Sequence, residues 1–292
     1  MAWCPGCTVI GFRGEDNNLW LGSNSDNPWD TRTRLVVRRD ENSYGIIGTE
    51  LLSPDCNVPW ANMLTRGLNE KGLAFVFSYV QPVGQDYSNT PGVSFREMAR
   101  SVLGKCASVD EAEAMLGSMR RAFHGNFIFA DRQGGLSLFE ISVEKMEVSR
   151  IEKSVIRCNH YTSENMRSLC DPDYMKSVNS MDRFDAANDA FLELTADERS
   201  PKEVVEGVLK SHKAKRPAED EWGHSPCNHG SGCGTVSSEI IDLKNEIFYY
   251  CFGWPCQDEP QNDGQLFQSS SWRGYKGYVL AQEREGVIFQ HE

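Results

Sequence analysis

Residues Gly6–Ile10, which read Gly-Cys-Thr-Val-Ile, and Leu19–Asp26, which read Leu-Trp-Leu-Gly-Ser-Asn-Ser-Asp, determine how the chain begins to fold. Apolar residues recur in both stretches, and Gly, Asp and Asn residues separate the two. This pattern predicts two neighbouring strands joined by a turn. The first strand opens on Cys7 and the second ends on Asp26, so the pairing predicts a thiol and a carboxylate close together.

Cys7 suits a nucleophile that becomes the N-terminus of its own chain. The α-amino group freed there has a pKa of about 7.7–8.0, so it can accept and return a proton near neutral pH. The thiol then needs no histidine as its base. Asp26 is the predicted partner that holds the amine in place. On spacing alone, Cys7 also fits a buried structural thiol, and Asp26 fits a turn aspartate.

The composition is typical of a globular protein with a sizeable core. The chain has 292 residues, of which 39% are hydrophobic and 25% are charged, and this fits one large layered domain. The formal net charge of −12 argues against a nucleic acid or an anionic membrane as partner, because both need clustered Lys and Arg. A small molecule or a peptide remains as the candidate partner, and a homo-oligomer stays open.

The sequence predicts a cytoplasmic location. No apolar run approaches the roughly 20 residues that span a bilayer, and the N-terminus has no basic region followed by an apolar stretch. Most of the ten cysteines are therefore expected to be reduced thiols.

Blocks of strands alternate with pairs of helices along the chain. Strands are predicted at residues 8–12, 19–23, 35–38, 63–67, 73–79, 126–130, 136–143, 235–243 and 247–252. Helices are predicted at 94–103 and 112–119 and in two pieces within 180–213. This order predicts an α+β fold in which two antiparallel sheets pack together with helices outside. Residues 7–292 form one predicted domain, with 257–292 as a candidate irregular extension.

Five segments match one known family in the same order. They are Gly6-Cys7-Thr8 with Asn24-x-Asp26, Gly67–Ala74, Cys158–Tyr161, Ser180-x-x-Arg183-Phe184, and Thr235–Leu243 with Gly253-x-Pro255-Cys256. Together they resemble the cysteine N-terminal-nucleophile (Ntn) hydrolases, which include choloylglycine hydrolases, penicillin V acylases and the acyl-CoA:aminopenicillanate acyltransferase-like proteins. The resemblance implies the Ntn hydrolase fold, a four-layer αββα sandwich of two antiparallel sheets.

The resemblance also implies a catalytic role for five residues. Cys7 would be the nucleophile, and Asp26 would hold and tune its α-amine. Asn159 would donate a side-chain N–H to the oxyanion hole, and the backbone N–H of Tyr79 would be the second donor. Arg183 would lie near the thiol and favour its thiolate. Read without the resemblance, Asn159 fits a loop amide and Arg183 a surface helix arginine.

Two details favour the acyltransferase-like branch of this family. Bile-salt and penicillin V enzymes carry an arginine three residues before the aspartate, and here that position is Ser23. The segment His224-x-x-Cys227-Asn228-His229 also resembles the acyltransferase branch. The serine at position 23 puts a bile-salt or penicillin V substrate in doubt.

The resemblance implies an amide-bond hydrolase or an acyltransferase that needs no metal or organic cofactor. Residues 1–6 would be a short leader, removed when the chain cleaves itself between Gly6 and Cys7. Cys7 would then attack a linear amide and form an acyl-enzyme. A related family of N-terminal-cysteine dipeptidases has a similar Asn-Ser-Asp-x-Pro sequence near the N-terminus, so dipeptidase activity is an alternative.

A zinc site is a second alternative, of a different class. Cys4 and Cys7 form a C-x-x-C pair, and Cys227 with Cys233 could complete four ligands. His224 or His229 could also contribute. Such a protein would bind metal without being a catalyst. An inactive relative that serves as a binding module is a further reading, against which the presence of Cys7, Asp26, Asn159 and Arg183 speaks.

Overall fold

Two antiparallel sheets lie at the centre of the structure, a computed structural model that describes residues 6–28, 31–52, 63–84, 90–213, 224–229, 233–256 and 274–290. The first sheet has six strands, in the order β12 (Ser154–Arg157), β1 (Gly6–Arg13), β2 (Leu19–Pro28), β13 (Cys233–Asp242), β14 (Ile247–Phe252) and β15 (Lys276–Val279). The second has eight strands, in the order β11 (Met146–Arg150), β10 (Leu136–Ile141), β9 (Gly125–Asp131), β6 (Leu73–Ser78), β5 (Met63–Asn69), β4 (Ile46–Leu52), β3 (Arg32–Arg38) and β16 (Gly286–Gln290). A short parallel pair, β7 (Val93–Ser94) and β8 (Arg121–Ala122), stands apart from both.

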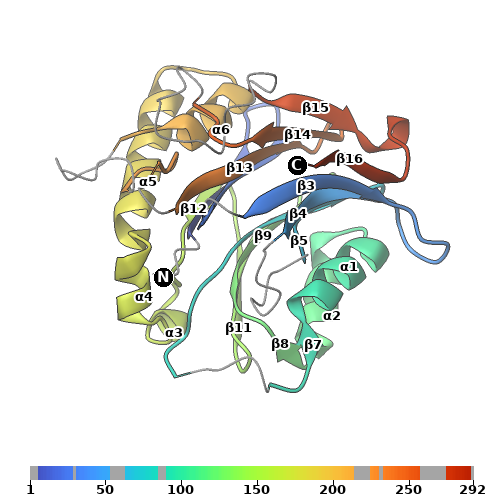
Figure 1. Ribbon diagram of the computed structural model, residues 1–292, viewed down its shortest axis with the longest axis horizontal. Helices are drawn as coiled ribbons and strands as arrows, with labels where there is room; N and C mark the ends of the chain where they lie inside the picture. Colours follow the sequence, from blue (N-terminus) through green and yellow to red (C-terminus); the bar gives the residue numbers. More distant parts are fainter. Residues whose placement is uncertain are drawn as a thin grey trace.

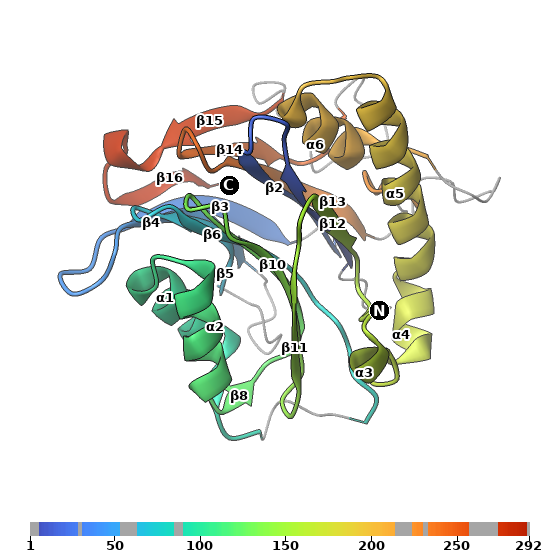
Figure 2. The same ribbon diagram turned by 180° about the vertical axis from the view of Figure 1, so that it is seen from behind.

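Helices cover the outer face of each sheet (Figures 1 and 2). On the six-stranded sheet lie α5 (Ser180–Ala196) and α6 (Pro201–Lys210), and on the eight-stranded sheet lie α1 (Phe95–Lys105) and α2 (Val109–Ser118). Two shorter helices, α3 (Glu164–Arg167) and α4 (Pro172–Ser177), lead into α5. The predicted four-layer αββα sandwich is therefore confirmed.

The alternation of side chains along each strand builds three apolar layers. On β1, Val9 belongs to the core between the sheets, and its neighbour Ile10 belongs to the core beneath α5 and α6. Adjacent residues of a strand face opposite sides, so one short sequence serves both layers. The N-terminal strand is thus buried on both faces, which fixes the position of every side chain on it.

Local capping explains where the helices begin. Ser94 and Glu97 form a capping box at α1, and Ser200 and Glu203 form one at α6. Ser108 caps α2 by accepting from the Glu111 N–H, whereas the Glu111 carboxylate takes the N–H of Ala107. The capping box that Ser108-x-x-Glu111 could form at α2 is therefore only half formed. None of the described helices is long and apolar enough to cross a membrane.

The C-terminal segment is more regular than the sequence indicated. Its described part, 274–290, contains β15, which pairs with β14, and β16, which pairs with β3. Tyr278 and Leu280 pack into the core between the sheets. The segment therefore extends both sheets, and the expectation of an irregular extension is wrong for these residues.

Candidate active site

Cys7 is the second residue of β1 and lies between the two sheets. It pairs with Ser25 of β2 and shares a strand face with Val9, a member of the core between the sheets. Only 6% of Cys7 is exposed. Nη2 of Arg66 lies 3.7 Å from its Sγ. The predicted nucleophile is therefore inside the sandwich, with a guanidinium beside its sulfur.

Arg66 is a site residue that the sequence reasoning missed. It is fully buried in β5 and reaches across to the six-stranded sheet. There its Nε donates to Ser23 Oγ at 2.8 Å and lies 3.3 Å from Glu239 Oε2. Ser23 is the position where the resemblance leads one to expect an arginine, so a guanidinium reaches that place from another strand. The available signal was a charged residue inside an apolar strand pattern, which needs a buried partner.

Burial raises the pKa of the Cys7 thiol above its ordinary value. The positive charge of Arg66 opposes the rise, the negative charge of Asp26 adds to it, and Arg183 opposes it less than Arg66 does. Because the balance leaves the pKa raised, Cys7 carries its proton at neutral pH. Attack by its sulfur therefore requires a base.

Asn159 follows β12 and holds the backbone nitrogen of Cys7. Its Oδ1 accepts from that nitrogen at 2.8 Å and from Nη2 of Arg183 at 2.6 Å. Both partners are donors, so the orientation of the amide is fixed. Its Nδ2 donates to the Tyr79 carbonyl at 2.7 Å. The same nitrogen carries a second hydrogen, which is the one that an oxyanion would accept.

Tyr79 comes directly after β6, at the edge of this amide network. Its ring packs edge-on against Tyr174 with centroids 5.6 Å apart, and its hydroxyl donates to Gln81 Oε1. The role that the resemblance implies for Tyr79 belongs to its backbone N–H and stays a prediction.

Arg183 connects three of the predicted residues. It lies on α5 and is fully buried. Its Nη1 donates to the Cys7 carbonyl at 2.6 Å and lies 3.5 Å from Asp26 Oδ2, while its Nη2 contacts Asn159. The sequence placed Arg183 near the thiol. In the structure it holds the backbone of Cys7, and the guanidinium against the sulfur belongs to Arg66.

The Asp26 carboxylate lies at the end of β2 within a set of donors. Oδ1 accepts from Thr235 Oγ1 at 2.8 Å, and Oδ2 accepts from Asn228 Nδ2 at 3.4 Å. Burial raises the pKa of the Asp26 carboxyl, and the charge of Arg183 and these two hydrogen bonds oppose that rise. Thr235 and Asn228 entered the sequence reasoning only as parts of motifs, and the structure places both against the carboxylate.

Gly6 lies directly opposite Asp26 in the β1–β2 hairpin. A Cβ atom at Gly6 would lie 2.9 Å from Asp26 Oδ2 and 2.9 Å from Arg183 Nη2. Such distances are shorter than a van der Waals contact, so a side chain at residue 6 would force Asp26 or Arg183 to shift. The Gly6–Cys7 bond therefore lies against the same carboxylate and guanidinium that surround Cys7.

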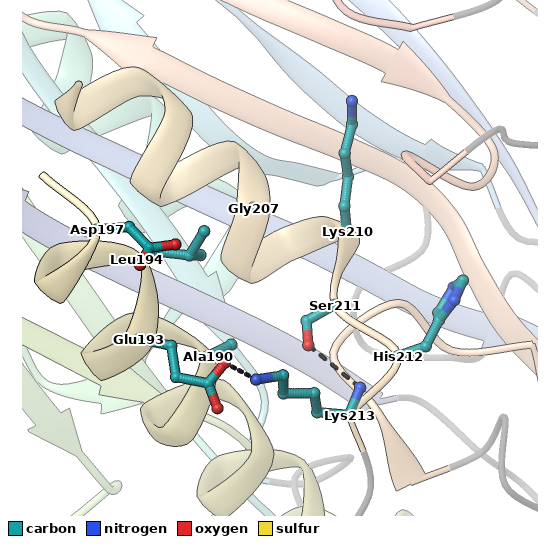
Figure 3. A pocket seen from close by; sticks show the side chains of 9 residues that line it. All are labelled: Ala190, Glu193, Leu194, Asp197, Gly207, Lys210, Ser211, His212 and Lys213. Atoms are coloured by element: carbon teal, nitrogen blue, oxygen red, sulfur yellow. Dashed lines mark hydrogen bonds and ion pairs between the residues drawn. The ribbon is translucent and has the colours of Figure 1, made fainter. Parts of the chain in front are cut away.

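A surface pocket between α5 and α6 lies outside this site (Figure 3). Its lining contains none of the five predicted catalytic residues: Ala190, Glu193, Leu194, Asp197, Gly207, Lys210, Ser211, His212 and Lys213. An ion pair between Lys213 and Glu193 crosses it. We assign no part of the chemistry to this pocket.

Of the zinc ligands proposed from the sequence, Cys227 and His229 are the ones that lie together among the residues that the structure describes. Cys4 lies outside the described residues, and Cys233 is disulfide-bonded. Cys227 lies beside His229, with Sγ and Nε2 3.2 Å apart. His224 pairs instead with Asp182, with Nδ1 and Oδ2 2.7 Å apart. Among the described residues, the cluster of potential metal ligands that contains Cys227 does not include Cys7.

A comparison with known protein families identifies the family of this chain. The sequence model of the acyl-coenzyme A:6-aminopenicillanic acid acyl-transferase family matches residues 13–253, more than half of the chain. The chain belongs to this family. No curated protein matches the chain by sequence.

Solved structures show the same fold as this member of the acyl-transferase family. A mutant of the conjugated bile acid hydrolase from Clostridium perfringens superposes with a TM-score of 0.56 at 14% identity, covering 98% of this chain and 96% of that one. The Caenorhabditis elegans ortholog of N-acylethanolamine-hydrolyzing acid amidase gives 0.53 at 15% identity, covering 82% and 93%. The penicillin V acylase from Agrobacterium tumefaciens gives 0.49 at 19% identity, covering 84% and 83%. The first two support the Ntn hydrolase fold.

Proposed function

We propose that this protein is an amide-bond hydrolase or acyltransferase that works through Cys7 as an N-terminal nucleophile. The observation that carries the proposal is the fixed position of the Cys7 backbone nitrogen, 2.8 Å from Asn159 Oδ1, while Arg66 lies against the sulfur of the same residue. The atom that would become the base is therefore held in place before it is freed.

Maturation would be an attack by the Cys7 thiol on the carbonyl carbon of Gly6. The acyl group moves from nitrogen to sulfur, water hydrolyses the thioester, and the leader leaves with a carboxylate. The α-amine of Cys7 remains on the enzyme. Gly6 suits this step because its missing side chain lets Asp26 and Arg183 approach the bond.

Removal of Gly6 changes the surroundings of Asp26. A backbone amide has one N–H, and that of Cys7 donates to Asn159. A free amine has at least two N–H bonds. Departure of Gly6 also opens space beside Asp26 Oδ2. The second N–H can then turn toward the carboxylate, which is the holding role predicted for Asp26.

In turnover, the free α-amine takes the proton of the Cys7 thiol and the sulfur attacks the substrate carbonyl. Electrons move onto the carbonyl oxygen, where the second N–H of Asn159 and the backbone N–H of Tyr79 would donate to it. The α-ammonium returns its proton to the leaving amine. Water or an acceptor amine then cleaves the thioester. No step requires a histidine.

The substrate class that we propose is a linear N-acyl amide. One structural neighbour is named for hydrolysing conjugated bile acids and another for hydrolysing N-acylethanolamines. Both names describe acyl groups joined to a small amine. The guanidinium of Arg66 lies against Ser23, 2.8 Å from its Oγ, so the absence of an arginine from the sequence at position 23 does not exclude these acyl groups.

Intact mass and N-terminal sequencing of wild type and Cys7→Ala test the proposal. We expect wild type to begin at Cys7 and to turn over members of a panel of N-acyl amines and short peptides. Cys7→Ala should keep residues 1–6 and show no turnover. Cys106→Ala is the matched control, since Cys106 is a buried free thiol on the helix side of the eight-stranded sheet. An active wild-type enzyme that still carries Met1 to Gly6 would overturn the mechanism.

A further inference from the structure

Two histidines and two cysteines converge near the start of β13 and the end of β14, and none of them is among the five predicted catalytic residues. The four are His212, Cys227, His229 and Cys256. Each offers one ligand atom, and the four atoms all lie within 4.8 Å of one another. Cys227 is buried, His229 and Cys256 are half-buried, and His212 is exposed, so solvent can reach the cluster from one side.

From this geometry we propose that the four side chains form a structural zinc site. Zinc bonds of about 2.3 Å to sulfur and 2.0–2.1 Å to nitrogen place tetrahedral sulfur and nitrogen ligands about 3.6 Å apart. The observed separations are 3.2 Å from Cys227 Sγ to His229 Nε2 and 3.3 Å from Cys256 Sγ to the same nitrogen. Small shifts of the four side chains would bring their ligand atoms to the separations of a tetrahedral zinc site.

The ligand types select the metal. Two thiolates and two imidazoles make a closed Cys₂His₂ set, which suits zinc and which is typical of structural rather than catalytic sites. Calcium and magnesium need oxygen ligands, and the four members of this cluster offer only sulfur and nitrogen. Two thiolates also neutralise the charge of a divalent ion, so the filled site carries no net charge.

The surrounding contacts hold the ligands in place. The His229 ring stacks on Trp254 with centroids 3.9 Å apart and an interplanar angle of 12°. The backbone N–H of Cys227 donates to the Ser211 carbonyl at 3.0 Å. His212 follows α6, and in Figure 3 its side chain lies apart from the Lys213–Glu193 pair. Ligands that are fixed before the metal arrives bind it more tightly, because less freedom is lost.

The site connects three segments that are distant in sequence. His212 comes from the end of α6, Cys227 and His229 from the segment 224–229, and Cys256 from the chain after β14. Between two of the ligands stands Asn228, whose side chain contacts Asp26. Its backbone N–H donates to Thr235 Oγ1 and its carbonyl accepts from the Thr235 N–H. The zinc would therefore fix the loop that presents Asn228 to the carboxylate.

Metal analysis of the full chain tests this proposal without reference to activity. The protein is purified without a polyhistidine tag and without chelators, and zinc is measured by inductively coupled plasma mass spectrometry. We expect about one zinc per chain. His229→Asn and Cys256→Ser should lose the metal, whereas His224→Asn and Cys106→Ser should keep it. His224 is the sharp control, because it lies in the same segment but pairs with Asp182.

Cobalt substitution gives a second measurement that needs no variant. Wild type exchanged into Co²⁺ should show the visible bands of a tetrahedral ion together with sulfur-to-cobalt charge transfer. Chelation should increase hydrogen exchange at the Asn228 and Thr235 amides. Wild type with no stoichiometric zinc and no cobalt spectrum would overturn the proposal, as would a peptide map with Cys227 and Cys256 joined in a disulfide.

Discussion

Two buried arginines act on Cys7 from different elements and through different atoms. Arg66 of β5 faces the sulfur at 3.7 Å, and Arg183 of α5 holds the carbonyl oxygen at 2.6 Å. Each is paired with a buried carboxylate, Glu239 for the first and Asp26 for the second. Burying a charge in the protein interior costs free energy, and each pair offsets that cost only while both of its partners are present. The site is therefore best probed by changing charge while keeping shape.

Asp26→Asn is expected to keep the fold and lose turnover. The amide has nearly the shape of the carboxylate and can still accept from Thr235 Oγ1. It cannot offer a negative charge to the α-amine or to Arg183. We expect kcat/KM to fall on the order of 10²-fold or more, comparable to the loss of one preorganised electrostatic contact. The measurement is kcat/KM on the best N-acyl amine, with thermal unfolding as the check on the fold. Turnover close to wild type would remove Asp26 from the mechanism.

Replacing Arg66 should raise the pKa of the Cys7 thiol further. Burial raises the pKa of the Cys7 thiol, and the positive charge of Arg66 lowers it. Removing that charge should therefore shift the pH profile of Cys7 labelling to higher pH. Iodoacetamide labelling should slow at neutral pH and approach the wild-type rate above both pKa values, where the thiolate predominates in each protein.

The matched variant for this test is Arg66→Met combined with Glu239→Gln. Arg66→Met alone leaves Glu239 buried without its partner, a defect of roughly 3–5 kcal/mol. The double variant removes both charges and should regain stability, yet it should keep the slow labelling. An unchanged pH profile in the double variant would show that Arg66 does not tune the thiol.

At the level of elements, the β1–β2 hairpin and the N-terminus of α5 assemble the site. The hairpin sets Gly6 opposite Asp26 and Cys7 opposite Ser25. At the start of α5, Ser180 accepts from the Asn159 N–H at 2.7 Å, and His160 Nδ1 lies 2.7 Å from the same hydroxyl. Burial lowers the pKa of His160 to about 4, so this histidine is neutral near pH 7.

Gly6→Val is expected to block or slow removal of the leader. The added side chain would meet Asp26 Oδ2 and Arg183 Nη2, each 2.9 Å from its Cβ, and β1 would have to shift away from both. Gly117→Ala on α2 is the control, since its nearest neighbour is Met146 Cε at 3.8 Å. Intact mass over time measures the cleaved fraction. Wild-type processing of Gly6→Val would show that close packing at residue 6 is not required.

For the whole molecule, the described C-terminal segment joins the two sheets at one edge. β15 adds to β14, β16 adds to β3, and Leu280 between them lies in the core that the sheets share. Side chains from both ends of the chain thus contribute to one apolar layer, because Val9 lies in the same core. The stability of the sandwich should depend on this closure.

Leu280→Ala should destabilise the fold by about 2–4 kcal/mol, the range for deleting a buried leucine side chain. Leu280 is 4% exposed, whereas Leu192 on α5 is 64% exposed. Leu192→Ala should therefore change stability by no more than roughly 0.5 kcal/mol. Denaturant unfolding of the two variants against wild type measures both values. Equal stability of the two would mean that the C-terminal segment does not close the core.

The sequence by itself determined the class of fold and the order of its main elements. Apolar alternation marked β1, β2 and β13, and helix caps marked α1 and α6, because these signals act between residues close in the chain. Strands such as β4 (Ile46–Leu52), buried along most of its length, and the short β12 were missed. A strand that is very short or buried on both faces shows little of the alternation by which a strand is recognised in a sequence.

Tertiary structure alone decided what surrounds the thiol and which cysteines gather. Ordered motifs could name Cys7 and Asp26, but no spacing predicts that Arg66 reaches the sulfur from the opposite sheet, 59 residues away. Likewise, His212 and Cys256 meet only because α6 and β14 end at the same edge of the molecule. Contacts between sheets depend on how the layers stack, and the packing of the whole apolar core fixes that stacking.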